Sequence, residues 1–287
     1  MNMLNNLGNS TYHSLQMQFT KRLTNGFTNT TTWTWSKALG ESDTDAGASY
    51  RDPNRRYLEK SLLGYDRTHQ ITSNGSYELP FGTNHFLLGN APQWVQNVAG
   101  KWQIGGIANY ITGQPLSFTT GTQTISTVGA AADIVGPLPR NIGNVAKLAH
   151  GVNYFNGYTI VPDLGLALAS PSCSGTNTCN GMAAAYSNKA LQAPNGQIVL
   201  MNPQPGGIGT LGWNSVKGPG TLNFDMDLIK RFKIHESQEF EFRLDAINIL
   251  NHPNFGVPTM SINSTSFGSI TSASGSRSFV VNTRVNF

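Results

Sequence analysis

The C-terminal stretch RSFVVNTRVNF, residues 277–287, decides how the rest of this chain is interpreted. From Phe279 to Phe287 every second residue is apolar or threonine, and the residues between them are mostly polar. A period of two residues predicts a β-strand with one apolar and one polar face. The length suits a transmembrane β-strand, which needs about 9–11 residues. The alternative is an edge strand of a soluble β-sandwich.

This stretch resembles the C-terminal strand of bacterial outer-membrane barrel proteins. In those proteins the barrel-assembly machinery recognises a terminal phenylalanine together with apolar residues at alternate positions before it. The resemblance implies that this machinery is a partner, that the chain is located in the cell outer membrane, and that outer-membrane lipid surrounds the strand. The implied assembly signal comprises Phe279, Val281, Val285 and Phe287.

The composition is compatible with a membrane barrel but does not require one. Only 12% of the 287 residues are charged, whereas about 25% are charged in average soluble proteins. Strands that are half apolar and half neutral-polar have such a composition, but so do secreted β-sandwiches and adhesins. The net charge of +4 comes from scattered basic residues. There is no basic stripe with interleaved aromatic residues, so no nucleic acid is expected as a partner.

Six more segments share the period of two residues. The expected strands lie near 12–22, 27–37, 69–79, 102–112, 222–232, 239–250 and 277–287. Short connections alternate with long ones, which puts the short turns at one end of a sheet and the long loops at the other. The longest connection is the large loop 113–219, within which the pattern places no hairpin. We therefore predict an all-β fold over 1–287, an antiparallel transmembrane β-barrel segment with long extracellular loops.

Aromatic residues lie near the ends of two expected strands. Trp33 and Trp35 lie close together near one strand end, whereas Trp102 and Tyr110 lie at opposite ends of a later strand. Trp and Tyr prefer the membrane–water interface, so these four residues predict an aromatic girdle. The alternative for the Trp33 and Trp35 pair is the core of a soluble sheet.

Two loop segments are candidates for chemical sites. Cys173 and Cys179, in PSCSGTNTCNG, predict a small loop disulfide, with two free thiols as the alternative. Asp43 and Asp45, in ESDTDAG, are spaced as in a calcium loop but lack the later bidentate glutamate, so a solvated acidic loop is favoured over a metal site. The chain contains no GxSxG, HExxH or GxxxxGK[ST] motif. We therefore expect neither an enzyme nor a cofactor.

Several segments together resemble a known family, the C-terminal barrel of TonB-dependent receptors, and more closely the Oar-like branch of Acidobacteria-type genomes. The segments occur in the family's order over nearly the whole chain, and 120–215 is the least diagnostic part. They read TYHSLQMQFTKRLTNGFTNTTTWTWSKAL, YDRTHQITSNGSYELPFG, KWQIGGIANYITGQPLSF, FRLDAINILNHPNFG and RVNF.

The resemblance implies energy-coupled uptake of an unidentified large nutrient. It implies a plugged barrel of about 22 strands, of which this chain would supply about the last seven. TonB would be a partner only through a missing N-terminal part, and the export signal is expected upstream of Met1. A barrel fragment of this kind should have two open edges. The alternative function is a secreted β-rich adhesin or carbohydrate-binding module.

Six charged residues are predicted to face the lumen of such a barrel. A basic residue on the lipid face costs about 2–4 kcal/mol at mid-bilayer, and a register slip of one residue would put Arg243 and Arg284 there. Pairing between strands and contact with the plug is the expected role, and substrate binding is the alternative. The six residues are Asp225, Asp227, Glu241, Arg243, Asp245 and Arg284.

Overall fold

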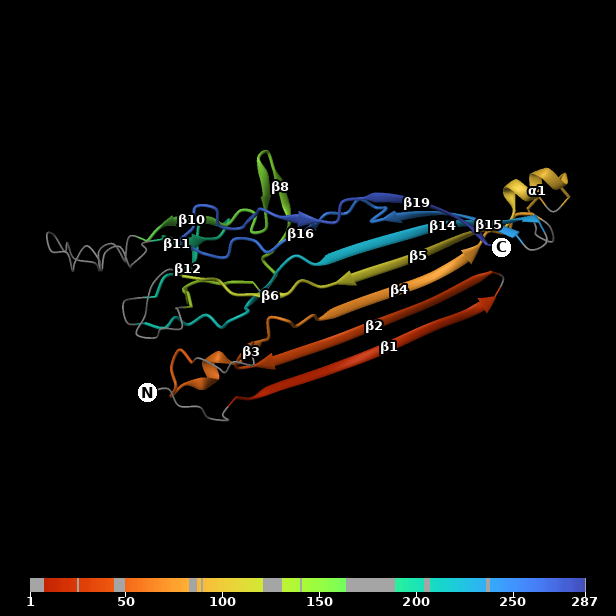
Figure 1. The fold of residues 1–287 in the computed structure, drawn as a ribbon. Helices are drawn as coiled ribbons and strands as arrows, with labels where there is room; N and C mark the ends of the chain where they lie inside the picture. The colour runs from red at the N-terminus through yellow and green to blue at the C-terminus, as the bar shows by residue number, and fades with distance from the viewer. Residues whose placement is uncertain are drawn as a thin grey trace.

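The structure is a computed structural model that describes residues 8–24, 26–43, 50–82, 87–88, 90–120, 131–139, 141–163, 189–203, 207–235 and 238–286. Its main feature is an antiparallel sheet of long strands, which confirms the predicted fold class (Figure 1). The long strands are β1 (Ser10–Thr24), β2 (Phe27–Gly40), β4 (His69–Glu78), β5 (Trp102–Ile111), β14 (Thr221–His235), β15 (Gln238–Ile247) and β19 (Ser278–Asn286). They follow one another as β1-β2-β4-β5-β14-β15-β19, and the short β3 (Ser61–Leu62) pairs with β2.

The register keeps each face of the sheet continuous from strand to strand. One row of directly opposite residues crosses five strands and consists of Met17, Trp33, Ile71, Tyr110 and Leu222. The neighbouring row consists of Gln18, Thr32, Thr72, Asn109 and Asn223. Because side chains alternate along a strand, the first row belongs to an apolar face of the sheet and the second to a polar face.

The short connections and the C-terminal end of β19 lie together at one end of the sheet, which we call the turn end (Figure 1). The turn between β1 and β2 contains Gly26 at φ +77°, a conformation that glycine adopts without steric cost. The connection between β4 and β5 contains the helix α1 (Gln93–Ala99), which the sequence pattern did not predict.

The predicted strand 239–250 is too long, because β15 ends at Ile247. Asn248 and Asn251 have φ values of +47° and +51°, and this left-handed conformation ends an extended strand. The Asn248 side chain stabilises the corner, since its Nδ2 donates to the carbonyl of His252 at 3.0 Å and its Oδ1 accepts from the His252 amide at 3.1 Å.

The long connections meet at the opposite end and form a second region, the cap, made of the described residues of 41–68, 112–220 and 248–277 (Figure 1). It contains short strands in the loop 113–219, where the sequence placed none. Besides β3 and the 3₁₀ helix η1 (Arg56–Glu59), its strands are β6 (Pro115–Leu116), β7 (Asp133–Ile134), β8 (Ala146–Leu148), β9 (Gly151–Asn153), β10 (Thr159–Pro162), β11 (Lys189–Gln192), β12 (Ile198–Met201), β13 (Val216–Lys217), β16 (Asn254–Phe255), β17 (Ser269–Ile270) and β18 (Ala273–Ser274).

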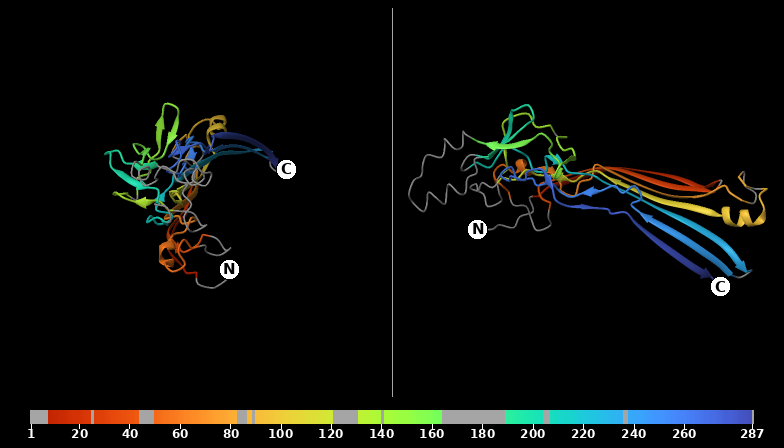
Figure 2. Two further views of the ribbon diagram at one scale, coloured as in Figure 1. Left: turned by 90° about the vertical axis from the view of Figure 1, so that its left-hand side faces the viewer. Right: turned by 90° about the horizontal axis from the view of Figure 1, so that it is seen from above.

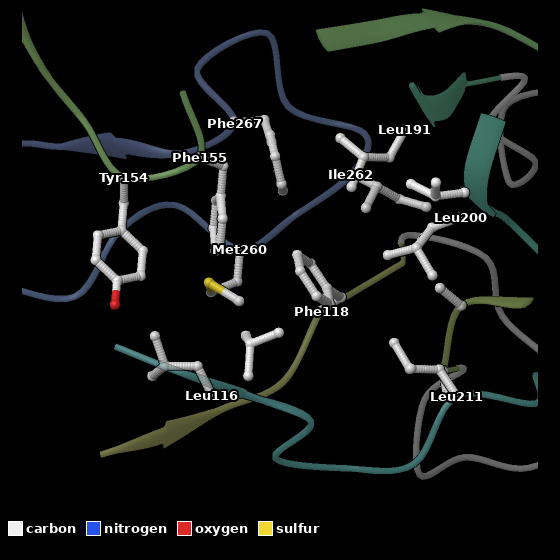
Figure 3. Close-up of a cluster of buried hydrophobic side chains, with 14 of the residues drawn as sticks. Leu116, Phe118, Tyr154, Phe155, Leu191, Leu200, Leu211, Met260, Ile262 and Phe267 are labelled. Carbon is white, nitrogen blue, oxygen red and sulfur yellow. The ribbon is translucent and has the colours of Figure 1, made fainter. Parts of the chain in front are cut away.

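A hydrophobic core holds the cap together (Figure 3). Phe118, Phe155 and Phe267 pack against one another, and the Phe155 ring centroid lies 5.5 Å from that of Phe118 and 5.1 Å from that of Phe267. Phe118 and Phe155 come from the loop 113–219, whereas Phe267 comes from the connection between β15 and β19. Two long connections therefore share one core.

The long sheet does not close on itself. Within the described residues β1 pairs only with β2, and β19 pairs only with β15. Seen from the cap end, the strands follow an open arc from β1 to β19 (Figure 2). The expectation of two open edges is thus met by the described strands.

Candidate functional site

Large apolar side chains are exposed along one face of the sheet. Phe19 is 64% exposed, Phe279 59% and Val281 60%. The few polar side chains in the middle of this face bond one another: Thr31 Oγ1 lies 2.8 Å from Ser73 Oγ, and Asn29 Nδ2 donates to the same oxygen at 3.1 Å. A surface of this kind suits a surrounding that cannot supply hydrogen bonds.

The apolar face carries aromatic residues at both ends of the strands. Trp33 and Tyr110 belong to one row near the cap, and Trp35 lies further towards it. Trp35 also lines a cavity of about 370 Å³ between the sheet and the cap. Trp102 lies at the turn end, opposite Lys230. The sequence pattern did not assign four further aromatic residues near the turn end to a girdle: Phe27, Tyr77, Phe232 and Phe240.

Lys230 is a cation on the apolar face that the sequence pattern did not identify. It is only 6% exposed, and its Nζ donates to the carbonyls of Val98 and Gly100 at the end of α1. The same Nζ lies 5.4 Å from the ring centroid of Trp102. A lysine on the lipid face of a barrel costs about 0–1 kcal/mol near the membrane interface but about 2–4 kcal/mol at mid-bilayer. We call the exposed apolar side chains of this face the apolar belt, and the position of Lys230 fits the edge of this belt.

The polar face differs between the two halves of the sheet. On β2 and β4 it is neutral apart from Glu78 at the end of β4. For example, Thr28 Oγ1 lies 2.9 Å from Ser76 Oγ. On β14, β15 and β19 it is charged, and the structure places all six predicted charged residues on this face. Their positions follow from the pairing of β14 with β5 and β15, and of β15 with β19.

Most of these charged groups are matched by neighbours on the same face. Arg243 Nε lies 2.6 Å from Asp245 Oδ1, and Asn282 donates to the other oxygen of Asp245 at 3.1 Å. Glu241 lies opposite both Arg231, which it binds at 2.6 Å, and Arg284. The Arg231–Glu241 pair and the Asn282–Asp245 hydrogen bond join neighbouring strands, whereas Arg243 and Asp245 both lie on β15.

Asp225 and Asp227 are held differently from the other four. Asp225 Oδ1 accepts the backbone amide of Asn248 at 2.7 Å, which fastens the corner after β15. Asp227 lies opposite Asp245 on one side and Gly105 on the other. A Cβ at Gly105 would collide with the Asp227 carboxylate, so the absence of a side chain there gives this carboxylate its room.

Asp43, one of the two weak candidates for a calcium ligand, forms hydrogen bonds within the protein. One of its carboxylate oxygens accepts the amide of Gly64 at 2.7 Å and the other accepts Asn214 Nδ2 at 3.2 Å. Asp45, Cys173, Cys179 and Phe287 lie outside the described residues. Among the residues that are described, no group of three or more His, Cys, Asp or Glu side chains could hold a metal ion.

Ion pairs fasten the first cap segment. Arg51 and Glu59 are 4% and 3% exposed, and Arg51 Nε lies 3.0 Å from Glu59 Oε1. Trp213 Nε1 donates to the other oxygen of Glu59. Burial alone would raise the pKa of Glu41, but hydrogen bonds from Arg56 and Tyr50 outweigh it and hold this pKa below its ordinary value.

A family model described as an outer membrane beta barrel domain matches residues 1–280. The chain belongs to this family. None of the curated proteins matches it. The two-faced meander and the exposed apolar belt agree with the family, and the outer membrane is the location of this barrel domain. No helix in the described part of the chain is long and apolar enough to cross a membrane.

The cap of the barrel domain contains a cavity with a volume of about 530 Å³. Tyr158 and Phe267 supply rings to its lining, and Asn153 and Lys189 supply polar groups. Burial raises the pKa of Tyr158 above its ordinary value, and Lys189 Nζ donates to the carbonyl of Asn263 at 2.7 Å. The sequence did not indicate this cavity, because its lining comes from segments without a regular period.

Proposed function

We propose that this chain is the C-terminal barrel part of a TonB-dependent outer-membrane receptor, which takes up a large nutrient with energy from the inner membrane. The single observation that carries the proposal is the open meander of long strands with two unpaired edges. Because a membrane barrel needs every strand edge paired, further strands must complete the wall. In the Oar-like receptors that this chain resembles, further strands precede the part of the barrel that corresponds to this chain.

In this proposal the apolar face contacts lipid and the polar face lines the lumen. Trp33, Trp35, Tyr110 and Trp102 then form aromatic girdles at the two interfaces. The charged half of the polar face, on β14, β15 and β19, serves mainly to pair strands and contact the plug. Substrate contact is a second role for it, favoured by the half-exposed Arg231 and Arg243 side chains, at 45% and 46% exposure.

The last strand has a separate role in assembly. One edge of strand β19 is unpaired among the described strands. In this proposal that edge pairs with the first strand of the barrel, which the rest of the receptor supplies. The residues Phe279, Val281 and Val285 share its apolar face, and with Phe287 they form the signal for the barrel-assembly machinery. The cap lies on the extracellular side, where a disulfide between Cys173 and Cys179 can form in an oxidising compartment.

The test uses the full reading frame expressed in a bacterium with an outer membrane. We expect the protein in the outer-membrane fraction, with a band that migrates faster before boiling than after it. We also expect purified periplasmic TonB domain to capture the detergent-solubilised receptor. A heat-modifiable barrel that TonB does not capture would keep the barrel assignment and overturn the receptor proposal. A protein recovered only from the culture medium would favour the secreted module instead.

A further inference from the structure

The connection between β4 and β5 has an exposed apolar surface at the turn end. Trp94 and Val98 are 71% and 67% exposed. They lie four residues apart on α1 and therefore on the same side of the helix. Leu87 and Leu88, before the helix, are 42% and 45% exposed. Periplasmic turns of barrels are usually short, so a connection that contains a helix and four exposed apolar side chains requires an explanation.

The helix is attached to the apolar face and not to the polar one. Lys230, whose row on β14 faces the same way as Trp102 and Phe242, donates to the carbonyls of Val98 and Gly100. Trp102 Nε1 also donates to the Val98 carbonyl, at 3.0 Å. A cation at the C-terminal end of a helix is favourable, because the helix dipole places negative charge there.

The attachment also places the helix at a fixed depth. Lys230 and Trp102 lie near the turn end of the apolar belt, one row before Phe232 and Phe240. Lys101, exposed beside the helix, adds a second cation at the same level. The helix has exposed apolar side chains, and a tryptophan and a lysine of the apolar face bind its C-terminal end. Together these features match an interfacial helix on a phospholipid leaflet.

We propose that α1 is a lipid anchor, in which Trp94 and Val98 insert among the acyl chains of the periplasmic leaflet of the outer membrane, while Lys101 binds the phosphate of a phospholipid headgroup. The anchor fixes the depth of β4, β5 and β14 in the membrane through the bonds of Lys230 and Trp102. This inference rests on the proposed orientation of the apolar face towards lipid.

The test measures how fast a charged, water-soluble maleimide labels single cysteines in the full-length protein, in outer-membrane fragments that are open to the reagent on both sides. Cys173 and Cys179 are first replaced by serine. Val98→Cys reports on the helix, with Trp94→Cys as a second position. Phe279→Cys is the control for the lipid-facing belt, and Ser266→Cys, exposed in the cap, is the control for water. Each variant must keep the heat-modifiable band.

We expect Val98→Cys to be labelled at least about tenfold more slowly than Ser266→Cys, since a side chain among acyl chains is shielded from an aqueous reagent. The protection should persist after reconstitution into vesicles of phosphatidylethanolamine and phosphatidylglycerol. Labelling as fast as that of Ser266→Cys would overturn the anchor. Protection in native membranes that is lost in the vesicles would also overturn it, because a protein would then cover the helix. Rapid labelling of Phe279→Cys would instead overturn the proposed orientation of the whole sheet.

Discussion

The sheet and the cap use the same residue types in opposite ways. Phe155 in the cap is 1% exposed, whereas Phe19 on β1 is 64% exposed. The cap buries its large apolar side chains against one another, so its own loops close a core in water. The sheet leaves such side chains on its surface, where lipid covers them in the proposed orientation. One chain therefore contains a part that buries its own hydrophobic core and a part whose apolar face stays exposed.

Charged groups show the same contrast. The cap buries an ion pair, Arg51 with Glu59, under Trp213. On the polar face of the sheet, Arg231 and Arg243 keep nearly half of their side-chain surface exposed while they bind carboxylates. Ion pairs thus fix a conformation inside the cap, whereas on the sheet they lie along a surface that other groups can reach.

The largest effect is expected from removing a ring from the cap core. Phe155→Ala should cost the cap about 3–5 kcal/mol, because a large buried cavity is left. External protease should then cut the cap in intact outer membranes while the heat-modifiable sheet remains. Phe19→Ala is the matched control and should leave the cap resistant. Equal protease resistance of both variants would contradict a separate cap core.

Breaking the buried ion pair should have the next largest effect. Arg51→Met leaves the Glu59 carboxylate buried without its cation, which costs about 3–5 kcal/mol for a fully buried pair. Denaturant unfolding followed by the fluorescence of Trp213, whose ring centroid lies 4.8 Å from the Arg51 guanidinium, measures it. The control Arg55→Met removes the exposed pair with Asp52 and should leave the unfolding midpoint unchanged. A midpoint that Arg51→Met did not move would show that the pair does not hold the cap.

Two neighbouring valines distinguish the faces of the sheet. Val281 lies on the apolar face opposite Leu244, and Val280 lies on the polar face opposite Asp245. Val281→Arg should cost up to about 2–4 kcal/mol, depending on its depth in the bilayer, and should lower the fraction of protein that assembles as a heat-modifiable band. Val280→Arg should assemble normally, since it meets water and a carboxylate. The reverse order would mean that the proposed faces are exchanged.

The smallest effect is expected only at alkaline pH. Burial raises the pKa of Tyr154 from 10.0 to about 12, and its hydroxyl donates to the carbonyl of Lys217 at 2.8 Å. Above pH 10 the unfolded chain loses this proton while the folded cap retains it, so the stability of the cap should fall between about pH 10 and 12. Tyr154→Phe should reduce the slope of stability against pH in this range. An unchanged slope would contradict the shifted pKa.

The sequence predicted the sheet better than the cap for a physical reason. The two-residue period of a strand is a local property, because successive side chains point to opposite faces of the sheet whatever the rest of the chain does. The six charged residues could be assigned to one face by this pattern. Cap contacts are not local, since Phe118 packs on Phe267 and Arg51 reaches the carbonyl of Leu211. No period in the sequence marks such partners.

The sequence by itself thus determined the strands, their two faces and the alternation of short and long connections. The tertiary structure alone decided that the long connections fold into a cap with its own core, and that α1 is attached by Lys230 to the apolar face. Lys230 breaks the apolar pattern of β14, and its place becomes understandable only when the carbonyls of Val98 and Gly100 are seen around it. Periodicity depends on neighbouring residues, whereas burial of a charge depends on distant ones that the fold brings together.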